Sequence, residues 1–175
     1  MYYSTLRTGA RAVTVPHPDA WLALNRALRR LLPGGPWPWL CSRRLLVAGG
    51  SMYPLLQAGD VLLVDRLAYA DDRIQRGDVV AFRHASAPSG RMVKLVAGLP
   101  GEHVEVRQDR LWINDRELIY PRAIVGSMPG QWSLEADEFF VLSVALAVGT
   151  DSRTFGPLKS EAVLGRVWFI LPPSP

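Results

Sequence analysis

The sequence predicts an all-β domain, built as a barrel or a coiled sheet, behind a short N-terminal amphipathic helix. From Leu45 onward, short apolar runs alternate with glycine, proline, asparagine and aspartate, which is typical of strands joined by turns. No helical period of useful length follows residue 45. Hydrophobic residues make up 49% of the chain and charged residues 21%, which is enough apolar material for a core. Many short strands in one domain of this size indicate a β-barrel or a coiled sheet.

The length of 175 residues predicts one domain with an appended N-terminal segment. We assign residues 1–44 to the segment and residues 45–175 to the β domain. Residues 1–17 show no period and are expected to form a loose arm. Asp19 is the expected N-cap of a cationic amphipathic helix at 19–32.

This predicted helix leaves two alternatives open. Its apolar side chains recur at spacings of three and four, so it can pack on the β domain. It can also lie in a membrane interface with its arginines toward lipid head groups, helped by the tryptophans of the Pro- and Gly-rich linker at 33–39. Residues 19–44 are therefore a candidate peripheral membrane contact.

The net charge is +4, a modest basic bias concentrated in the first quarter of the chain. Such a cluster can meet an anionic membrane surface or nucleic acid, or it can be a solvated face. No DNA or RNA recognition motif accompanies it, so no nucleic-acid partner is expected. The cluster consists of Arg26, Arg29, Arg30, Arg43 and Arg44.

Cysteine and histidine usage argues against a metal site or a disulfide framework. Cys41 is the only cysteine, which excludes an intramolecular disulfide. His17, His84 and His103 are scattered without metal-ligand spacing, so no metal and no cofactor is expected. No stretch reaches the roughly 18 to 20 apolar residues of a spanning helix, and the N-terminus lacks a secretory signal. The chain as given is expected to be soluble or peripheral.

The predicted strands lie between turn residues along the whole β domain. In chain order they are Leu45–Ala48, Asp60–Asp65, Val79–Phe82, Arg91–Ala97, Val104–Arg107, Arg110–Ile113, Glu138–Val148 and Gly165–Leu171. Hairpin-like connections are expected at 85–90 and at 108–109, with further turns at 98–101 and 114–115.

Ser51 lies on a segment that suits a nucleophile. Gly49 and Gly50 allow close backbone approach and unusual φ values, and Pro54 stiffens the exit of the turn. Taken alone, a serine between glycines is most often an ordinary loop residue.

Lys94 is a second unusual residue because its strand neighbours are apolar. An edge-strand lysine that faces water is the common alternative, since it protects a sheet from aggregation. A buried lysine, however, loses part of its preference for the ammonium form, and its neutral amine can act as a general base toward a serine hydroxyl. The unremarkable positions of the histidines fit a mechanism without a histidine relay.

Four motifs in fixed order resemble those of the type I signal peptidases. They span nearly three quarters of the chain, from about residue 45 to residue 171, and the ordered set is far more specific than any one of them. The motifs are Ser51-Met52-Tyr53-Pro54-Leu55-Leu56, Gly77-Asp78-Val79-Val80-Ala81-Phe82, the lysine motif at 93–102 and Asp151-Ser152-Arg153-Thr154-Phe155-Gly156-Pro157.

The resemblance implies an all-β catalytic fold with a Ser-Lys dyad, related to the autoproteolytic SOS repressors. Ser51 would be the nucleophile and Lys94 the general base. Support for the oxyanion and for the site would come from the Ser51 amide with Gly50, and from an ion pair between Asp151 and Arg153. The neighbouring Met52 and Pro54 would contact the substrate, which similar enzymes bind as an extended strand with small side chains just before the cut.

Three positions depart from the family pattern. Ser143-Val144-Ala145 stands where the late motif normally opens with Gly-Asp-Asn. Gly149 stands where many relatives have a serine whose hydroxyl can touch the lysine, and Gly49 stands where some have a hydroxyl donor. The loss of one oxyanion donor reduces the rate of such enzymes by about 10²- to 10³-fold. A slower or narrower enzyme is therefore one expectation, and an inactive relative is another.

The leading hypothesis is a serine endopeptidase that removes a signal peptide or leader from a preprotein after small residues. The alternative is a catalytically impaired β domain that binds extended peptides or a membrane surface. A self-cleaving regulator is a third hypothesis, but residues 1–44 do not supply the two packed helices of a DNA-binding motif. Family resemblance implies membrane association; without a spanning helix in this chain, a soluble cytoplasmic protein is the alternative.

Overall fold

The computed structural model describes residues 11–12, 42–66, 68–69, 73–118, 129–145 and 149–173. Within these ranges strands dominate and form two antiparallel sheets, so the all-β prediction is confirmed. The predicted helix at 19–32 and the linker at 33–39 lie outside the described residues.

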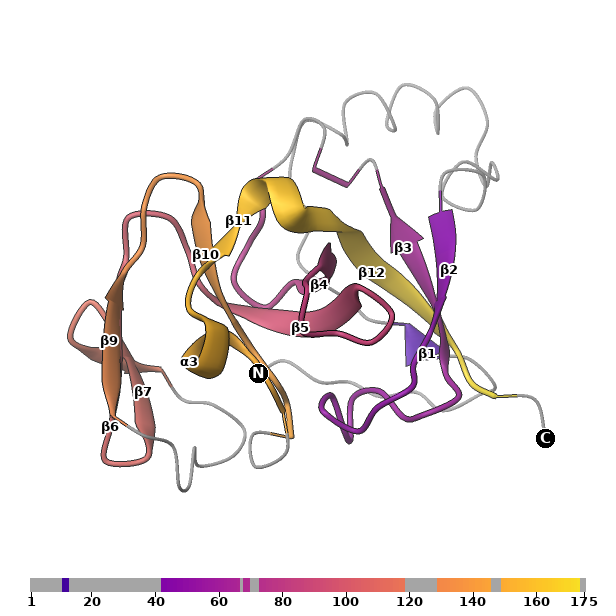
Figure 1. Cartoon of the computed structure of the whole chain (residues 1–175), viewed down its shortest axis with the longest axis horizontal. Helices are drawn as coiled ribbons and strands as arrows, with labels where there is room; N and C mark the ends of the chain where they lie inside the picture. Colours follow the sequence, from indigo (N-terminus) through magenta and orange to yellow (C-terminus); the bar gives the residue numbers. More distant parts are fainter. Residues whose placement is uncertain are drawn as a thin grey trace.

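The larger sheet has eight described strands and runs through most of the molecule (Figure 1). Its order is β11-β10-β5-β4-β12-β3-β2, and β1 pairs with β12 beside this path. Register shifts between Phe140 and Val141, and at two places in β12, interrupt the ladders. Such bulges bend strands and increase their twist, which curls the sheet. The strands are β1 (Arg11–Ala12), β2 (Ser42–Leu46), β3 (Val61–Asp65), β4 (Val79–Arg83), β5 (Arg91–Gly98), β10 (Glu138–Leu142), β11 (Leu158–Lys159) and β12 (Val163–Leu171).

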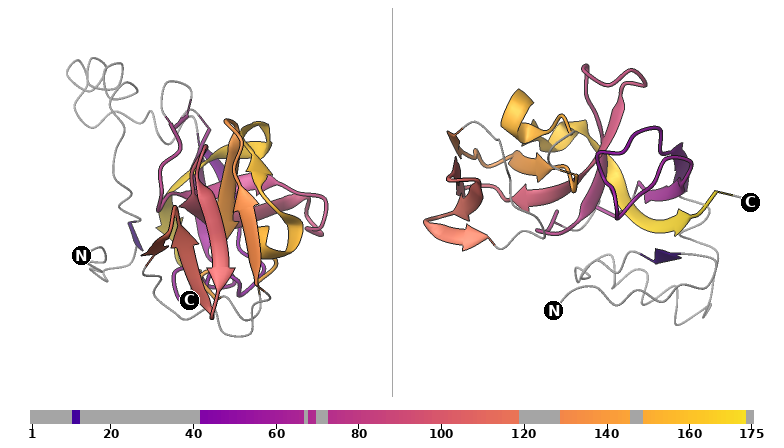
Figure 2. Two further views of the ribbon diagram at one scale, coloured as in Figure 1. Left: turned by 90° about the vertical axis from the view of Figure 1, so that its left-hand side faces the viewer. Right: turned by 90° about the horizontal axis from the view of Figure 1, so that it is seen from below.

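The smaller sheet lies at one end of the molecule, opposite β2 and β3 (Figures 1 and 2). Its order is β8-β7-β6-β9, and the chain enters it from β5 and leaves it into β10. Its strands are β6 (His103–Arg107), β7 (Arg110–Ile113), β8 (Arg116–Leu118) and β9 (Gly130–Ser133). Two short helices follow β10, α3 (Ser152–Phe155) and the 3-10 helix η1 (Ser160–Ala162).

A repeated sequence opens two neighbouring strands of the large sheet. Gln-x-Gly-Asp occurs at 57–60 before β3 and at 75–78 before β4. In each copy the glycine has a positive φ, 93° and 91°, which glycine adopts without steric cost. The aspartate then accepts a hydrogen bond from the backbone N–H of the glutamine, at 2.8 Å for Asp60 and 2.9 Å for Asp78. These turns fix where both strands begin.

The predicted strands are all present, with ends that differ by a few residues. The strand expected at 45–48 is β2 and begins earlier, at Ser42, and the one expected at 138–148 ends at Leu142. Residues 11–12, expected in a loose arm, pair with Phe169 and Ile170 of β12. The sequence analysis did not predict β8, β9, β11 or α3, which have only two to four residues each.

Candidate active site

Ser51 lies in the turn that leads from β2 to β3. The turn is closed by backbone hydrogen bonds from Tyr53 to Gly50, at 3.0 Å, and from Leu56 to Met52, at 2.9 Å. The side chains of Met52 and Leu56 are buried in a core cluster of the large sheet. These two residues therefore hold the turn in place and leave Ser51 half-buried at its edge. Met52 thus anchors the turn, and the substrate contact that the family resemblance implies for it stays a prediction.

The two glycines before Ser51 do not use the unusual φ values that glycine allows. Neither Gly49 nor Gly50 has a positive φ. A Cβ added at either position would meet no described atom within 4 Å. Among the described residues, both glycines thus leave room for a side chain. Pro54, which follows a cis peptide bond, is exposed on the same turn.

Lys94 lies in β5, between β4 and β10, and only 3% of its surface is exposed. The edge-strand alternative is therefore wrong. The Lys94 Nζ donates a hydrogen bond to the Ser51 Oγ at 2.6 Å, across 43 residues of sequence. Such a short distance is typical of a charge-assisted hydrogen bond. The structure thus brings together the two side chains that the sequence analysis singled out as nucleophile and base.

Burial lowers the pKa of Lys94 from 10.5 to about 8. Water is excluded from the ammonium, which disfavours the charged form. The carboxylate of Asp151 opposes this effect and raises the pKa, while the guanidinium of Arg153 lowers it. The chain has one further lysine, Lys159, which is exposed and forms ion pairs with Glu135 and Asp137. These contacts raise the pKa of Lys159, so the two lysines shift in opposite directions.

Asp151 and Arg153 form an ion pair at the start of α3. Arg153 Nε and Nη2 each donate to one carboxylate oxygen of Asp151 at 2.8 Å. Asp151 is fully buried, and it also caps α3 by accepting from the Arg153 backbone N–H at 3.2 Å. Such a two-pronged pair fixes the direction of both side chains. The charge of Asp151 therefore acts on Lys94 from a fixed position.

The segment after β10 connects this ion pair to the serine turn. The backbone N–H of Ser143 donates to Asp151 Oδ2 at 2.9 Å, and the N–H of Ala145 donates to the Ser51 carbonyl at 2.8 Å. Ser143 is fully buried. The residues at 143–145, which depart from the family pattern, are therefore a structural part of the site.

Two departures from the family pattern lie in contact with each other. A Cβ added at Gly149 would overlap the side chain of Ser143, and it would lie 3.3 Å from the Cβ of Ser51. The sequence analysis treated positions 143 and 149 as separate losses. The structure shows that the side chain of Ser143 occupies the space that a side chain at 149 would need.

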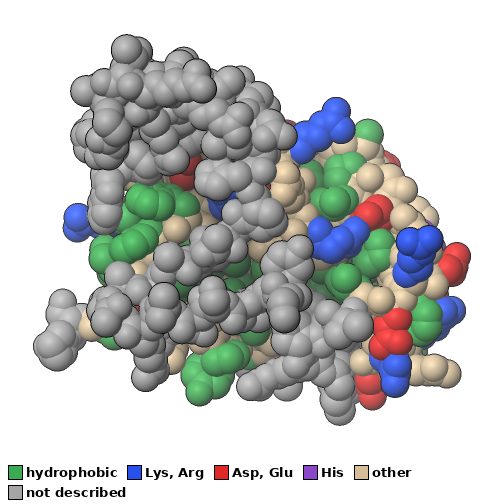
Figure 3. Space-filling view, turned by 180° about the vertical axis from the view of Figure 1, so that it is seen from behind, with side chains coloured by type: hydrophobic (Ala, Val, Ile, Leu, Met, Phe, Trp, Pro, Cys, Tyr) green, Lys and Arg blue, Asp and Glu red, His purple; other side chains and the backbone are tan. Residues whose placement is uncertain are grey.

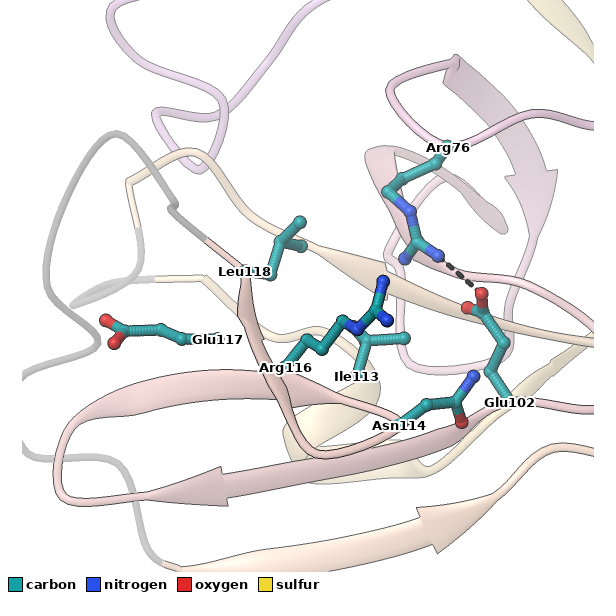
Figure 4. Close-up of a pocket in the computed structure, with 7 residues that line it drawn as sticks. All are labelled: Arg76, Glu102, Ile113, Asn114, Arg116, Glu117 and Leu118. Carbon is teal, nitrogen blue, oxygen red and sulfur yellow. Dashed lines mark hydrogen bonds and ion pairs between the residues drawn. The ribbon is translucent and has the colours of Figure 1, made fainter.

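Other features of the described residues do not point to a different site. No group of three or more His, Cys, Asp or Glu side chains in this part of the chain is arranged to hold a metal ion. A hollow of about 500 Å³ lies beside the ion pair of Arg76 and Glu102, where it is bordered by the β7–β8 hairpin (Figure 4). None of the predicted site residues lines this hollow. Among the described residues, no helix has the length and hydropathy needed to cross a bilayer.

Comparison with known proteins gives consistent matches. The family model described as signal peptidase, peptidase S26, matches residues 40–171. Signal peptidase I of Bacillus caldolyticus is 30% identical over 164 residues, which cover 78% of this chain and 89% of that protein. A probable signal peptidase I-2 of Synechocystis sp. is 26% identical over 184 residues, covering 100% of this chain and 84% of the relative. A crystal structure of a signal peptidase I from Enterococcus faecalis is 27% identical and covers 55% of this chain and 97% of that one, with a TM-score of 0.45.

These matches define the chain as a serine-type peptidase. Within that class, it belongs to the signal peptidase family, peptidase S26. The matched residues include the turn that carries Ser51 and the strand that carries Lys94. The family resemblance inferred from the four ordered motifs is thereby confirmed.

Proposed function

We propose that this chain is a serine endopeptidase that uses Ser51 as nucleophile and Lys94 as general base. Its substrate is a preprotein, from which it removes a signal peptide or leader by cleavage after small residues. The observation that carries the proposal is the 2.6 Å contact between Lys94 Nζ and Ser51 Oγ, made by a lysine that is almost completely buried. The family of the chain supports the choice of a signal peptide as substrate.

The proposed reaction begins when Lys94 is neutral, so that its lone pair accepts the proton of the Ser51 hydroxyl. The Oγ forms a bond to the carbonyl carbon of the scissile peptide, and the carbonyl electrons move onto the oxygen. Collapse of this tetrahedral intermediate breaks the C–N bond, and the Lys94 ammonium returns the proton to the leaving amine. Water then attacks the carbonyl carbon of the Ser51 ester while Lys94 takes one of its protons. The C–Oγ bond breaks, the Lys94 ammonium returns the proton to the Ser51 Oγ, and the acid product is freed.

The negative oxygen of the intermediate needs donors that are in place before the reaction. We propose that the backbone N–H of Ser51 is one of them. At Gly49 and Gly50 an added Cβ would meet no described atom within 4 Å, which supports an approach of the substrate from this side. The ion pair of Asp151 and Arg153 has a supporting role, because it is buried and fixes the charge that acts on Lys94.

The decisive test uses a synthetic peptide with small residues before the cut and the variants Ser51→Ala and Lys94→Ala. Each variant is expected to lose cleavage to background while it keeps the circular dichroism spectrum of the folded protein. Lys159→Ala is the matched control, since it removes the other lysine from an exposed position. Undiminished cleavage by either site variant would refute the dyad. Peptide binding without turnover by the wild type would instead favour a binding domain.

The pH profile gives a second test of the base. Since Lys94 must be neutral to act, kcat/KM should rise with pH and level off above an apparent pKa of about 8. Below that pH, each further unit should reduce the rate about ten-fold, because the neutral fraction falls ten-fold. A limb near pH 10.5, the value of an ordinary lysine, would contradict a buried base.

A further inference from the structure

The side chain of Ser143 lies inside the proposed site although no motif marks it. Gly149 lies close to Ser51, since its added Cβ would be 3.3 Å from the Ser51 Cβ. The same added atom would overlap the Ser143 side chain. The hydroxyl of Ser143 therefore occupies the space directly beside Ser51, and the residue is fully buried there.

The register of the large sheet places Ser143 beside Lys94 as well. In the antiparallel ladder between β10 and β5, Val141 is paired with Val96 and Leu142 with Leu95. Ser143 follows Leu142 directly, so it lies at the end of this ladder, next to the part of β5 that carries Lys94. The Lys94 Nζ donates to Ser51 in this structure, with no hydrogen bond to the Ser143 Oγ. The overlap at Gly149 and the end of the ladder thus both place Ser143 close to the dyad.

The position of Ser143 is fixed by groups outside the dyad. Its backbone N–H donates to the buried carboxylate of Asp151 at 2.9 Å. Two residues later, Ala145 donates to the carbonyl of Ser51 at 2.8 Å. The hydroxyl is therefore carried by a backbone that is attached both to the ion pair and to the serine turn.

We propose that Ser143 is a positioning residue whose hydroxyl orients the Lys94 amine toward Ser51, and that Gly149 is glycine because this hydroxyl takes its side-chain space. The inference rests on the proposed dyad. A neutral amine has one lone pair and two N–H donors. If the lone pair receives the Ser51 proton, a hydroxyl oxygen that accepts an N–H holds the lone pair in the productive direction.

The first experiment compares Ser143→Ala with Ser42→Ala. Ser42 is a half-buried serine of β2 outside the four motifs, whose Oγ accepts from the Trp168 Nε1–H at 2.7 Å. Ser143→Ala should reduce kcat by about 10- to 100-fold with KM unchanged, a part of the 10²–10⁴ that general base catalysis supplies. Its pH limb should move to lower pH, because a methyl group desolvates the ammonium further. Ser42→Ala should leave kcat and the limb of the folded enzyme unchanged.

The second experiment moves the hydroxyl to the facing position. Gly149→Ser alone should lose activity and thermal stability, since the new side chain overlaps Ser143. The double variant Ser143→Gly, Gly149→Ser removes that overlap and returns a hydroxyl to the same space. The kcat of the double variant should therefore be at least ten-fold higher than that of Gly149→Ser, as expected for two energetically coupled positions. Should Gly149→Ser fail to fold, recovery of folding by the double variant is the equivalent result.

The outcomes separate this inference from the proposed function. Full kcat and an unmoved pH limb in Ser143→Ala, with Ser51→Ala and Lys94→Ala inactive, would overturn the role of Ser143 alone. A double variant no better than Gly149→Ser would overturn the shared space. If the Ser51 and Lys94 variants keep their activity, the dyad and the positioning role both fail.

Discussion

The two sheets differ in the kind of side chain that they bury. In the small sheet the buried residues of the four strands are apolar, namely Val104, Val106, Leu111 and Ile113. Its charged groups lie on the surface, as in the ion pairs Arg107–Glu105 and Arg110–Glu117, and acidic and basic side chains alternate over this end of the molecule (Figure 3). The large sheet and its connections bury charges instead. The buried polar residues there are Asp60, Asp65, Asp78, Lys94, Ser143, Asp151, Ser152 and Arg166.

This difference supports the large sheet as the location of the proposed site. A buried charge costs free energy unless it is paired, so a sheet that serves only stability gains little from one. Most of the buried charged side chains in the large sheet have a hydrogen-bonding partner. Asp78, for example, accepts a hydrogen bond from the Tyr69 hydroxyl at 2.8 Å. Lys94 is different, because its burial is only partly offset by Asp151 and its pKa falls. Because the desolvation of Lys94 is not fully compensated, its neutral amine is more accessible, and a neutral amine can act as a base.

The largest expected effect comes from removing the buried carboxylate at 151. Asp151→Ala takes away the acceptor of Arg153, of the α3 N-terminus and of the Ser143 N–H. We expect a loss of about 3–5 kcal/mol in the free energy of unfolding, typical of a broken buried pair. Activity per folded molecule should also fall. Urea unfolding together with peptide cleavage measures both quantities.

Leu111→Ala in the small sheet is the comparison for this variant. It removes a fully buried side chain and should cost about 2–5 kcal/mol, through lost burial and a cavity. Below its unfolding transition, however, it should cleave peptide at the wild-type rate. Equal losses of activity in Asp151→Ala and Leu111→Ala would contradict the assignment of the proposed site to the large sheet.

The next effect is a gain in stability. Lys94→Met replaces the desolvated ammonium by an apolar side chain of similar shape, so it should abolish activity and stabilise the fold. A shift from 10.5 to about 8 corresponds to about 3 kcal/mol, less about 1 kcal/mol for the lost hydrogen bond to Ser51.

The pH dependence of this gain fixes its cause. Between pH 8 and 10.5 the unfolded chain holds more protons at Lys94 than the folded one, so wild-type stability rises with pH over this window. Below pH 8, Lys94 is charged in both the folded and the unfolded state, and the full cost of desolvating its ammonium is present. The advantage of Lys94→Met should therefore be greatest below pH 8 and fade toward 10.5, which chemical denaturation at several pH values tests. A constant difference would exclude the ammonium as its source.

The smallest effect is expected on the surface of the small sheet. Arg110→Ala breaks an ion pair whose side chains are 59% and 35% exposed. Exposed pairs contribute about 0.2–1 kcal/mol, and salt screens them. Thermal unfolding should shift little at low salt and not at all at 1 M salt, with unchanged cleavage. A loss comparable with that of Asp151→Ala would contradict the contrast between the two sheets.

The sequence was most informative where several residues recur in a fixed order. The four motifs predicted the family. The apolar neighbours of Lys94 left open whether its side chain is buried or faces water on an edge strand, and the place of β5 between β4 and β10, with 3% of Lys94 exposed, decides for burial. Gly49 and Gly50 show the limit of such reasoning, because glycine allows a positive φ without requiring one and neither residue has it.

Ser143 could not be predicted because its role depends on the register between β10 and β5 and on the empty side-chain position at Gly149. Neither the register nor the space at Gly149 can be read from the sequence, where Ser143 only departs from the family motif. The anchoring of the turn by Met52 could not be predicted either, because the burial of its side chain in the core depends on the fold. The helix α3, with four residues, is too short to show a period.

The use of lysine in this chain has a practical consequence. Apart from Lys94 and Lys159, every basic residue that counts toward its charge is an arginine, which stays protonated. A sample labelled with nitrogen-15 only in lysine should therefore give two side-chain amine resonances, one from Lys94 in β5 and one from the ion-paired Lys159 on the surface. Because the pKa of Lys94 is lowered and that of Lys159 is raised, the two resonances would titrate at different pH values. Magnetic resonance could thus follow the protonation of the proposed base directly, in a resting enzyme without substrate.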